Sequence, residues 1–175
     1  MGSAVILAAT AGMHQGAALA QTQNTGFSVL ALDSNTGNNN SAFGHAALRN
    51  NKNGHDNTAT GRDALRKNLT GYNNTANGAG ALYSNTSGDE NVANGQSALF
   101  FNTSGSNNMA TGAYALTQHT VGEENNAAFG YKSLYFNTTD TNTTGFGTNA
   151  LSRNTTGRFN SAFARNALYG TYKLT

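Results

Sequence analysis

Large apolar residues return at one nearly constant interval through most of the chain. A leucine recurs at spacings of 16, 17, 17, 17, 17, 18, 17 and 17 residues. The residue before it is alanine in eight copies and Ser133 in the other. A unit this short cannot bury a hydrophobic face alone, so its copies must stack on one another as a solenoid. The leucines, eight of which are expected in the core of complete coils, are Leu32 and then Leu48, Leu65, Leu82, Leu99, Leu116, Leu134, Leu151 and Leu168.

Polar positions keep the same register as the leucines. The unit reads N-T-A-x-G-x-x-A-L-x-x-N-T-T-G-x-N, with a degenerate first copy at residues 24–32 and a last copy at residues 160–168. Two glycine columns mark two corners, where the chain is expected to need a positive φ. The first column is Gly44, Gly61, Gly78, Gly95, Gly112, Gly130 and Gly147, and the second is Gly54, Gly71, Gly88, Gly105, Gly122 and Gly157.

The pattern predicts an all-β fold, a parallel β-solenoid or β-roll of about nine 17-residue coils. Glycine, asparagine and threonine are poor helix formers, and helical repeats are usually 33 residues or longer. Each coil is expected to contain two or three short strands, and nine coils at the strand spacing give a rod on the order of 43 Å long. The expected division is an apolar arm or irregular first coil at 1–23, the solenoid at 24–168 and a tail at 169–175.

Asparagine columns are expected to form hydrogen-bonded ladders. A side-chain amide both donates and accepts, so each copy can bond to the copies above and below it. The first column is Asn40, Asn57, Asn74, Asn91, Asn108, Asn126 and Asn160, and the second is Asn51, Asn68, Asn85, Asn102, Asn137 and Asn154. The alternative is N-glycosylation, because Asn142 and all members of the second column except Asn51 lie in N-x-S/T sequons.

Small residues predict a narrow core. Alanine recurs two residues after the first ladder position and again before nearly every leucine, which leaves the leucine as the one large apolar residue of each coil. Its burial contributes on the order of 2 kcal/mol per coil to the stability of the fold. Ordering each backbone residue costs about 1–2 kcal/mol, which makes a lone rod marginal and favours association between chains. Aromatic residues precede the first glycine column in the outer units and follow the leucines in others; they pack locally over a corner or form a seam between chains.

Composition and charge narrow the possible functions. The 175 residues include 27 Asn, 23 Thr and 21 Gly, with no Cys, Pro or Trp, and the net charge is only +2. Such a charge does not indicate nucleic-acid binding, and the absence of cysteine excludes disulfides and thiol chemistry. No motif indicates a catalytic group, a cofactor or a metal site, so we expect no enzyme activity and no cofactor.

The first 20 residues are small and mostly apolar. They end in Ala-Leu-Ala before Gln21, as at a signal-peptide cleavage site, but they lack a positively charged start. His14 and Gln15 interrupt the apolar run, which is too short to span a membrane. We expect a structural arm, with a secretion signal as the alternative.

The unit N-T-A-x-G-x-x-A-L resembles the head repeats of trimeric autotransporter adhesins, and tandem repeats of other bacterial surface and phage tail-fibre proteins. The resemblance covers residues 24–168. It implies a left-handed parallel β-roll, three chains side by side and a place outside the cell or on its surface. This chain has Phe, Thr or Asn before the first corner glycine, where those heads generally have an aliphatic residue.

These features favour an extracellular structural protein that self-assembles into a filament. Its partners would be copies of itself, end to end, side by side or as a trimer. The alternative is a trimeric adhesin head or tail-fibre segment that binds a glycan or another surface ligand. Ice binding is a third option, for which the best threonine column is Thr86, Thr103, Thr120, Thr138 and Thr155.

Overall fold

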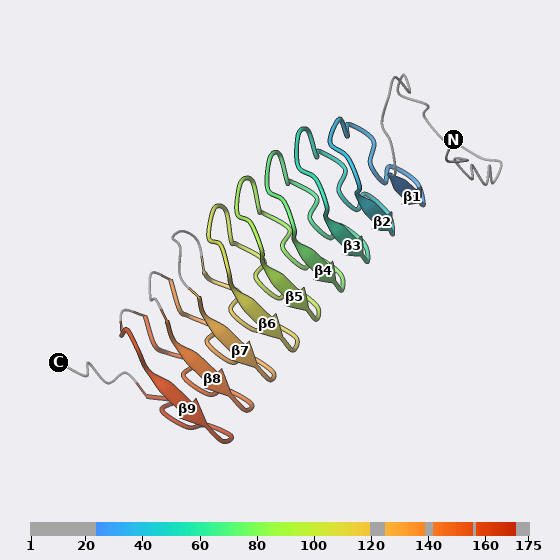
Figure 1. The fold of residues 1–175 in the computed structure, drawn as a ribbon. Coiled ribbons are helices and arrows are strands. Elements are labelled where there is room, and N and C mark those ends of the chain that lie inside the picture. Colours follow the sequence, from blue (N-terminus) through green and yellow to red (C-terminus); the bar gives the residue numbers. More distant parts are fainter. Residues whose placement is uncertain (1–23, 120–124, 139–141, 156, 171–175) are drawn as a thin grey trace.

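The computed structural model describes residues 24–119, 125–138, 142–155 and 157–170, and within them the chain forms a rod of stacked coils (Figure 1). Nine three-residue strands pair in chain order into one parallel sheet, which confirms the predicted all-β solenoid. The strands are β1 (Thr25–Phe27), β2 (Ser41–Phe43), β3 (Thr58–Thr60), β4 (Thr75–Asn77), β5 (Val92–Asn94), β6 (Met109–Thr111), β7 (Ala127–Phe129), β8 (Thr144–Phe146) and β9 (Ser161–Phe163). The arm at 1–23 and tail residues 171–175 lie outside the described residues.

Strand pairing follows the sequence repeat without slippage. Ala59 of β3 pairs with Ala76 of β4, and Ala76 pairs in turn with Ala93 of β5. The middle residue of each strand points inward and is fully or nearly fully buried in β2 to β9, whereas the residue after it is at least partly exposed. Because side chains alternate across a strand, this register keeps the small middle residues of β2 to β9 in the core.

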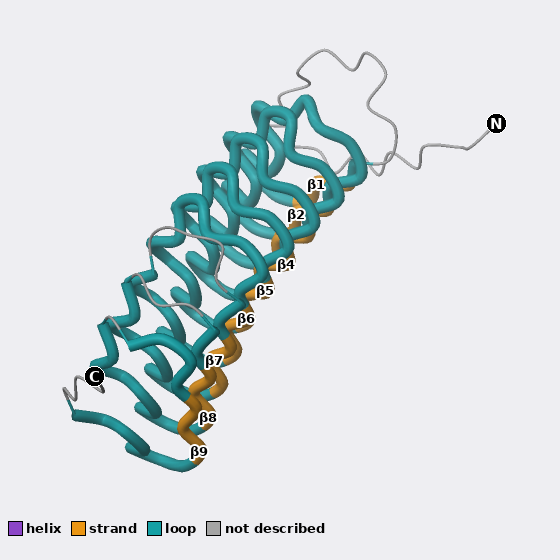
Figure 2. The backbone as a smooth tube through the Cα atoms, turned by 60° about the vertical axis from the view of Figure 1, so that its left-hand side comes forward, coloured by secondary structure: helices purple, strands orange, loops and turns teal. Residues whose placement is uncertain are grey.

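Each coil contains one strand, so the expectation of two or three was wrong. The strands follow one side of the rod, and turns make up the other sides (Figure 2). Tight turns replace the additional strands: Ala64 N donates to Gly61 O at 3.3 Å, and Asn68 N donates to Leu65 O at 3.1 Å. Positive φ values at Gly61, Asp63 and Leu65 turn the chain at every second residue and prevent an extended conformation.

The first glycine column has the positive φ that the repeat predicts. All seven of its residues have φ between 122° and 144°. A Cβ at Gly78 would lie 2.6 Å from the carbonyl carbon and oxygen of Gly95 in the next coil. Glycine is therefore needed both for its φ and for the close approach of neighbouring coils.

The second glycine column needs glycine for a different reason. The predicted positive φ is wrong for its described members, and Gly122 lies outside the described residues. The positive φ falls two residues later, as at Asp56 (55°) and Glu90 (58°). A Cβ at Gly71 would lie 2.4 Å from Gly88 O and 2.6 Å from Asn68 Oδ1. These glycines make room for the asparagine side chains and for the next coil.

Leucines of the inner coils form a continuous core with the alanines. The leucines from Leu48 to Leu134 are fully buried and Leu151 is 3% exposed. Every leucine of the column has a φ of about +50°, a conformation unusual for a residue with a branched side chain. The predicted burial of Leu168 is wrong: it is 41% exposed, because no further coil of the described chain covers it.

Candidate functional site

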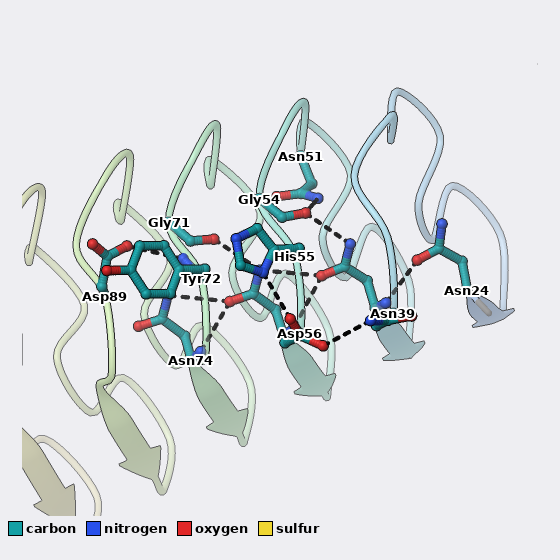
Figure 3. Close-up of polar contacts among 12 residues, drawn as sticks. Asn24, Asn39, Asn51, Gly54, His55, Asp56, Gly71, Tyr72, Asn74 and Asp89 are labelled. Atoms are coloured by element: carbon teal, nitrogen blue, oxygen red, sulfur yellow. Dashed lines mark hydrogen bonds and ion pairs between the residues drawn. The ribbon is translucent and has the colours of Figure 1, made fainter. Parts of the chain in front are cut away.

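The first asparagine column forms a buried ladder inside the rod. Asn74 Nδ2 donates to Asn57 Oδ1 at 3.1 Å and to Gly88 O at 2.8 Å, and the same Asn57 oxygen accepts the Asn74 backbone N–H at 3.0 Å. Asn57 and Asn91 repeat this arrangement one coil before and one coil after. Each amide thus joins two coils and closes its own coil (Figure 3).

The second column forms a parallel ladder, and both ladders donate to the same glycine carbonyl oxygens. Asn68 Nδ2 donates to Asn51 Oδ1 at 2.7 Å and to Gly71 O at 2.9 Å, while Asn57 Nδ2 donates to the same Gly71 oxygen at 2.8 Å. Asn85 and Asn102 continue the column at 2.8 Å and 3.0 Å. From Asn51 to Asn91 the two ladders pair side-chain amides whose burial would otherwise destabilise the fold, whereas Asn102 Oδ1 is buried without a hydrogen-bond partner among the described residues.

Towards the carboxyl-terminal end the first ladder keeps its backbone bonds, but the side-chain amide of Asn108 turns to its own coil and donates to Ser106 O at 3.1 Å. Asn108 N donates to Asn91 Oδ1, Asn126 N to Asn108 Oδ1, and the backbone N–H of Thr143 to Asn126 Oδ1, all at 3.0 to 3.1 Å. Thr143 occupies a ladder position that the asparagine pattern omitted, and its hydroxyl donates to Gly157 O at 3.3 Å. Asn160, the last predicted member, is only partly buried.

His119 occupies a position of the second ladder that the asparagine pattern does not reveal. It lies three residues after Leu116, as Asn85 lies three residues after Leu82, so the register could have revealed it. Its ring is fully buried, and burial lowers its pKa to about 4. An imidazole therefore replaces an amide in the column and stays neutral near pH 7.

Most sequon asparagines face the interior. Asn68, Asn85, Asn102 and Asn137 are fully buried, whereas Asn142 is exposed. Two threonines of the column considered for ice binding bond to the next coil: Thr86 Oγ1 donates to Thr103 O at 2.8 Å, and Thr138 Oγ1 donates to Thr155 O at 3.3 Å. These two hydroxyls are engaged within the rod, and Thr120 lies outside the described residues.

Phenylalanines occupy the outer face of the sheet at its two ends. Phe27 and Phe43 lie on β1 and β2 and are 54% and 42% exposed, and Phe146 and Phe163 lie on β8 and β9 and are 54% and 68% exposed. The aligned positions of β3 to β6 are Thr60, Asn77, Asn94 and Thr111. On this face of the sheet, the exposed aromatic surface is therefore concentrated near the two ends.

A second aromatic strip follows the leucine column. Tyr83 stacks on Phe100 with ring centroids 4.8 Å apart and planes 1° apart, and Lys67 Nζ lies 5.0 Å from the Tyr83 centroid. These contacts show local packing over a corner. A seam with another chain along this strip stays a prediction.

A shallow recess of about 400 Å³ lies beside the second corner near the amino-terminal end, and Asn39, Asn53, His55 and Asp56 are among its lining residues. Asn39 Nδ2 donates to Asp56 Oδ1 at 3.0 Å, and His55 Nδ1 lies 2.7 Å from Asp56 Oδ2. The hydrogen bonds from His55 and then Asn39 lower the Asp56 pKa.

Tyr72 extends this corner along the rod. Its ring lies parallel to that of His55 at 5.1 Å (Figure 3). The Asp89 carboxylate raises the pKa of Tyr72. The corner thus presents a carboxylate, amides and a stacked aromatic pair to solvent.

Within the described ranges, no group of three or more His, Cys, Asp or Glu side chains is placed to hold a metal ion. Those ranges also contain no helix that is long and apolar enough to cross a membrane.

The fold and ladders define the chain as a β-solenoid repeat protein. No protein-family model, no curated protein and no solved structure matches it. The resemblance to trimeric autotransporter adhesin heads therefore stays a prediction.

Proposed function

We propose that this protein is a non-enzymatic structural subunit that assembles end to end into a filament outside the cell. The observation that carries the proposal is the exposed core of the last described coil. Leu168 is 41% exposed, whereas the leucines at the same position in the coils from Leu48 to Leu134 are fully buried. A further coil stacked on this surface would cover that apolar area and continue the sheet.

Parallel stacking makes the two ends of the sheet different from each other. β1 presents one edge of the ladder and β9 the other, so a contact between them is head to tail. A head-to-tail contact that does not close into a ring generates an open filament. The location outside the cell rests on the resemblance of the repeats to those of surface proteins.

Sedimentation velocity and negative-stain electron microscopy at increasing protein concentration test the proposal. We expect rods of variable length that grow with concentration, and we expect Leu168→Glu to shorten them by placing a charge in the joint. Phe101→Glu is the matched control, since Phe101 is similarly exposed but lies on the side of a central coil. Discrete particles of one size at every concentration would refute the filament.

The recess beside Asp56 favours a second candidate, a segment that binds a surface glycan. Carboxylate and amide groups next to an aromatic ring can hydrogen-bond sugar hydroxyls and pack against a sugar face. A glycan array probed with the purified chain tests this candidate. Binding that Asp56→Asn and Tyr72→Ala remove, and that the exposed control Asn77→Ala preserves, would support it; no binding would end it.

A further inference from the structure

We infer that the joint of the proposed filament is a parallel pairing of β9 with β1 of the next copy. The register places Ser161 opposite Thr25, Ala162 opposite Gly26 and Phe163 opposite Phe27. This inference rests on the proposed function and identifies the partner surface as the first coil of a second copy of this chain. Four features of the terminal coils carry it.

Terminal strands repeat one alternation that the central strands lack. β1 and β8 both read Thr-Gly-Phe, whereas β2 and β9 both read Ser-Ala-Phe. Thr-Gly-Phe therefore pairs with Ser-Ala-Phe twice inside the chain, at β1 with β2 and at β8 with β9. Adding β1 of a second copy after β9 continues the alternation through the joint.

Phenylalanine rings form a column that would run across the same joint. The centroids of Phe129 and Phe146 are 5.4 Å apart, and those of Phe146 and Phe163 are 6.3 Å apart. Pairing Phe163 with Phe27 would place the exposed Phe27 ring of the next copy beside the end of this column. Covering the two exposed rings removes apolar surface from water at the joint.

The corner residues of the terminal coils also match. The first-column glycine is replaced by Ser28, with a φ of 134°, and by Ala164, with a φ of 146°. The chain already accommodates a Cβ at this corner between its first two coils. There Gly44 N donates to Phe27 O at 3.1 Å, whereas the same bond from Gly61 to Phe43 O is 2.7 Å. The first coil of the next copy can cover Ala164 with the same slightly longer hydrogen bond between coils.

Hydrogen-bonding groups at the two ends are complementary in the same register. Inside the chain, Thr25 N donates to Asn40 O at 2.8 Å. The equivalent bond at the joint runs from Ser161 N to Asn24 O of the next copy, since a carbonyl oxygen can accept more than one hydrogen bond.

Cysteine cross-linking tests the register, because the chain has no cysteine of its own. Phe27→Cys and Phe163→Cys proteins are prepared separately, mixed and oxidised. Paired residues on adjacent strands lie about 4.8 Å apart, within the Cα separation that a disulfide spans. We expect a disulfide-linked dimer from the mixture, and mapping of the linked peptides should show the 27–163 bond.

Two control pairs make each outcome interpretable. Phe27→Cys with Phe43→Cys in one chain reports an internal pair in known register, and should form an intramolecular bond. Phe27→Cys mixed with Asn94→Cys should give no dimer above background, since Asn94 lies in the middle of the sheet.

The outcomes separate this inference from the proposed function. Rods together with a 27–163 bond support both. Rods without that bond, while the internal pair forms its disulfide, overturn the joint and leave the filament standing. Monomeric particles without intermolecular bonds refute the filament and the joint together.

Discussion

Asn57 Nδ2 donates a 2.8 Å hydrogen bond to the carbonyl oxygen of Gly71, fourteen residues further along the chain. This bond closes one coil, and the bond from Asn57 Nδ2 to Asn40 Oδ1 at 3.1 Å connects that coil to the preceding one. One side-chain amide therefore maintains both the shape of a coil and the spacing between coils. In a rod whose core contains mainly alanine and one leucine per coil, these buried polar bonds specify the register.

Replacing Asn74 with leucine should destabilise the rod strongly. The change removes the donors to Asn57 Oδ1 and Gly88 O and the oxygen that accepts from Asn91. Leaving buried amide groups unpaired costs about 1–3 kcal/mol each, so we expect the free energy of unfolding to fall by about 3 kcal/mol or more. Urea denaturation followed by circular dichroism measures the loss.

Asn77→Leu is the control for this measurement. Asn77 lies in the same coil, but its side chain is exposed and bonds to Asn94 at 3.3 Å. We expect a change within about 0.5 kcal/mol, as for most surface substitutions. Equal losses for the two variants would show that the buried ladder does not hold the coils.

Gly78→Ala and Gly80→Ala should lower the free energy of unfolding by different amounts, although the two glycines are only two residues apart. A Cβ at Gly78 meets the backbone of Gly95 at 2.6 Å with a φ of 135°, whereas Gly80 has a φ of 67°, similar to that of Ala46 in its own column. We expect a loss of about 3 kcal/mol or more for Gly78→Ala and about 1 kcal/mol or less for Gly80→Ala. Thermal unfolding compares them, and similar melting temperatures would contradict the proposed close approach.

Leu82→Ala should mainly lower the stability of the single chain, whereas Leu168→Ala should mainly weaken assembly into rods. Leu82 is fully buried, so its truncation should cost about 2–5 kcal/mol. Leu168 is 41% exposed, so its truncation should cost much less in dilute protein but should shorten the rods. Urea unfolding at low concentration and electron microscopy at high concentration report the two effects. Unchanged rod length for Leu168→Ala would argue against burial of this leucine in a joint.

His119 should make stability fall in acid. Its folded pKa of about 4 is below the ordinary value of 6.5, so the unfolded chain binds the proton more readily. The stability that depends on the neutral ring is fully present above pH 6.5 and is lost as pH falls towards 4. The full loss is on the order of 3 kcal/mol. Urea unfolding at pH 7 and pH 4.5 measures most of it.

His119→Asn provides the comparison for this pH dependence. An asparagine restores the residue type of Asn102 and Asn137 to the ladder and removes the titrating group. We expect the variant to lose less stability between pH 7 and pH 4.5 than the unmodified chain. A parallel pH dependence would assign the acid loss to the carboxylates.

Ala164→Gly should lengthen the rods. In the inner coils a Cβ at this corner would meet the next coil at about 2.6 Å, so glycine there permits the closer spacing. Sedimentation velocity should show larger assemblies at equal concentration, whereas Ala162→Gly, which lies in β9 on the inward side, should not enlarge them. Shorter rods from Ala164→Gly would contradict the inferred joint.

Much of the architecture could be predicted because one period controls every column. The leucine spacing gave the coil length, and the asparagine spacing gave the residues that form the ladders. The asparagine pattern omits His119 and Thr143 because it depends on residue type, whereas the ladder depends on position in the repeat. The single strand per coil could not be predicted, since it depends on a positive φ at Leu65 and at the other leucines of its column, a conformation that a leucine rarely adopts.

The sequence by itself determined the solenoid class, the coil length and most of the residues that stack, because a regular repeat places similar side chains above one another. Only the tertiary structure decided why each residue is there. It distinguished glycines that need a positive φ from those that make room for asparagine, as at Gly78 and Gly71. It also showed that Leu168 and Phe163 remain exposed. Close approach and burial depend on the neighbouring coil, and a local pattern does not contain that neighbour.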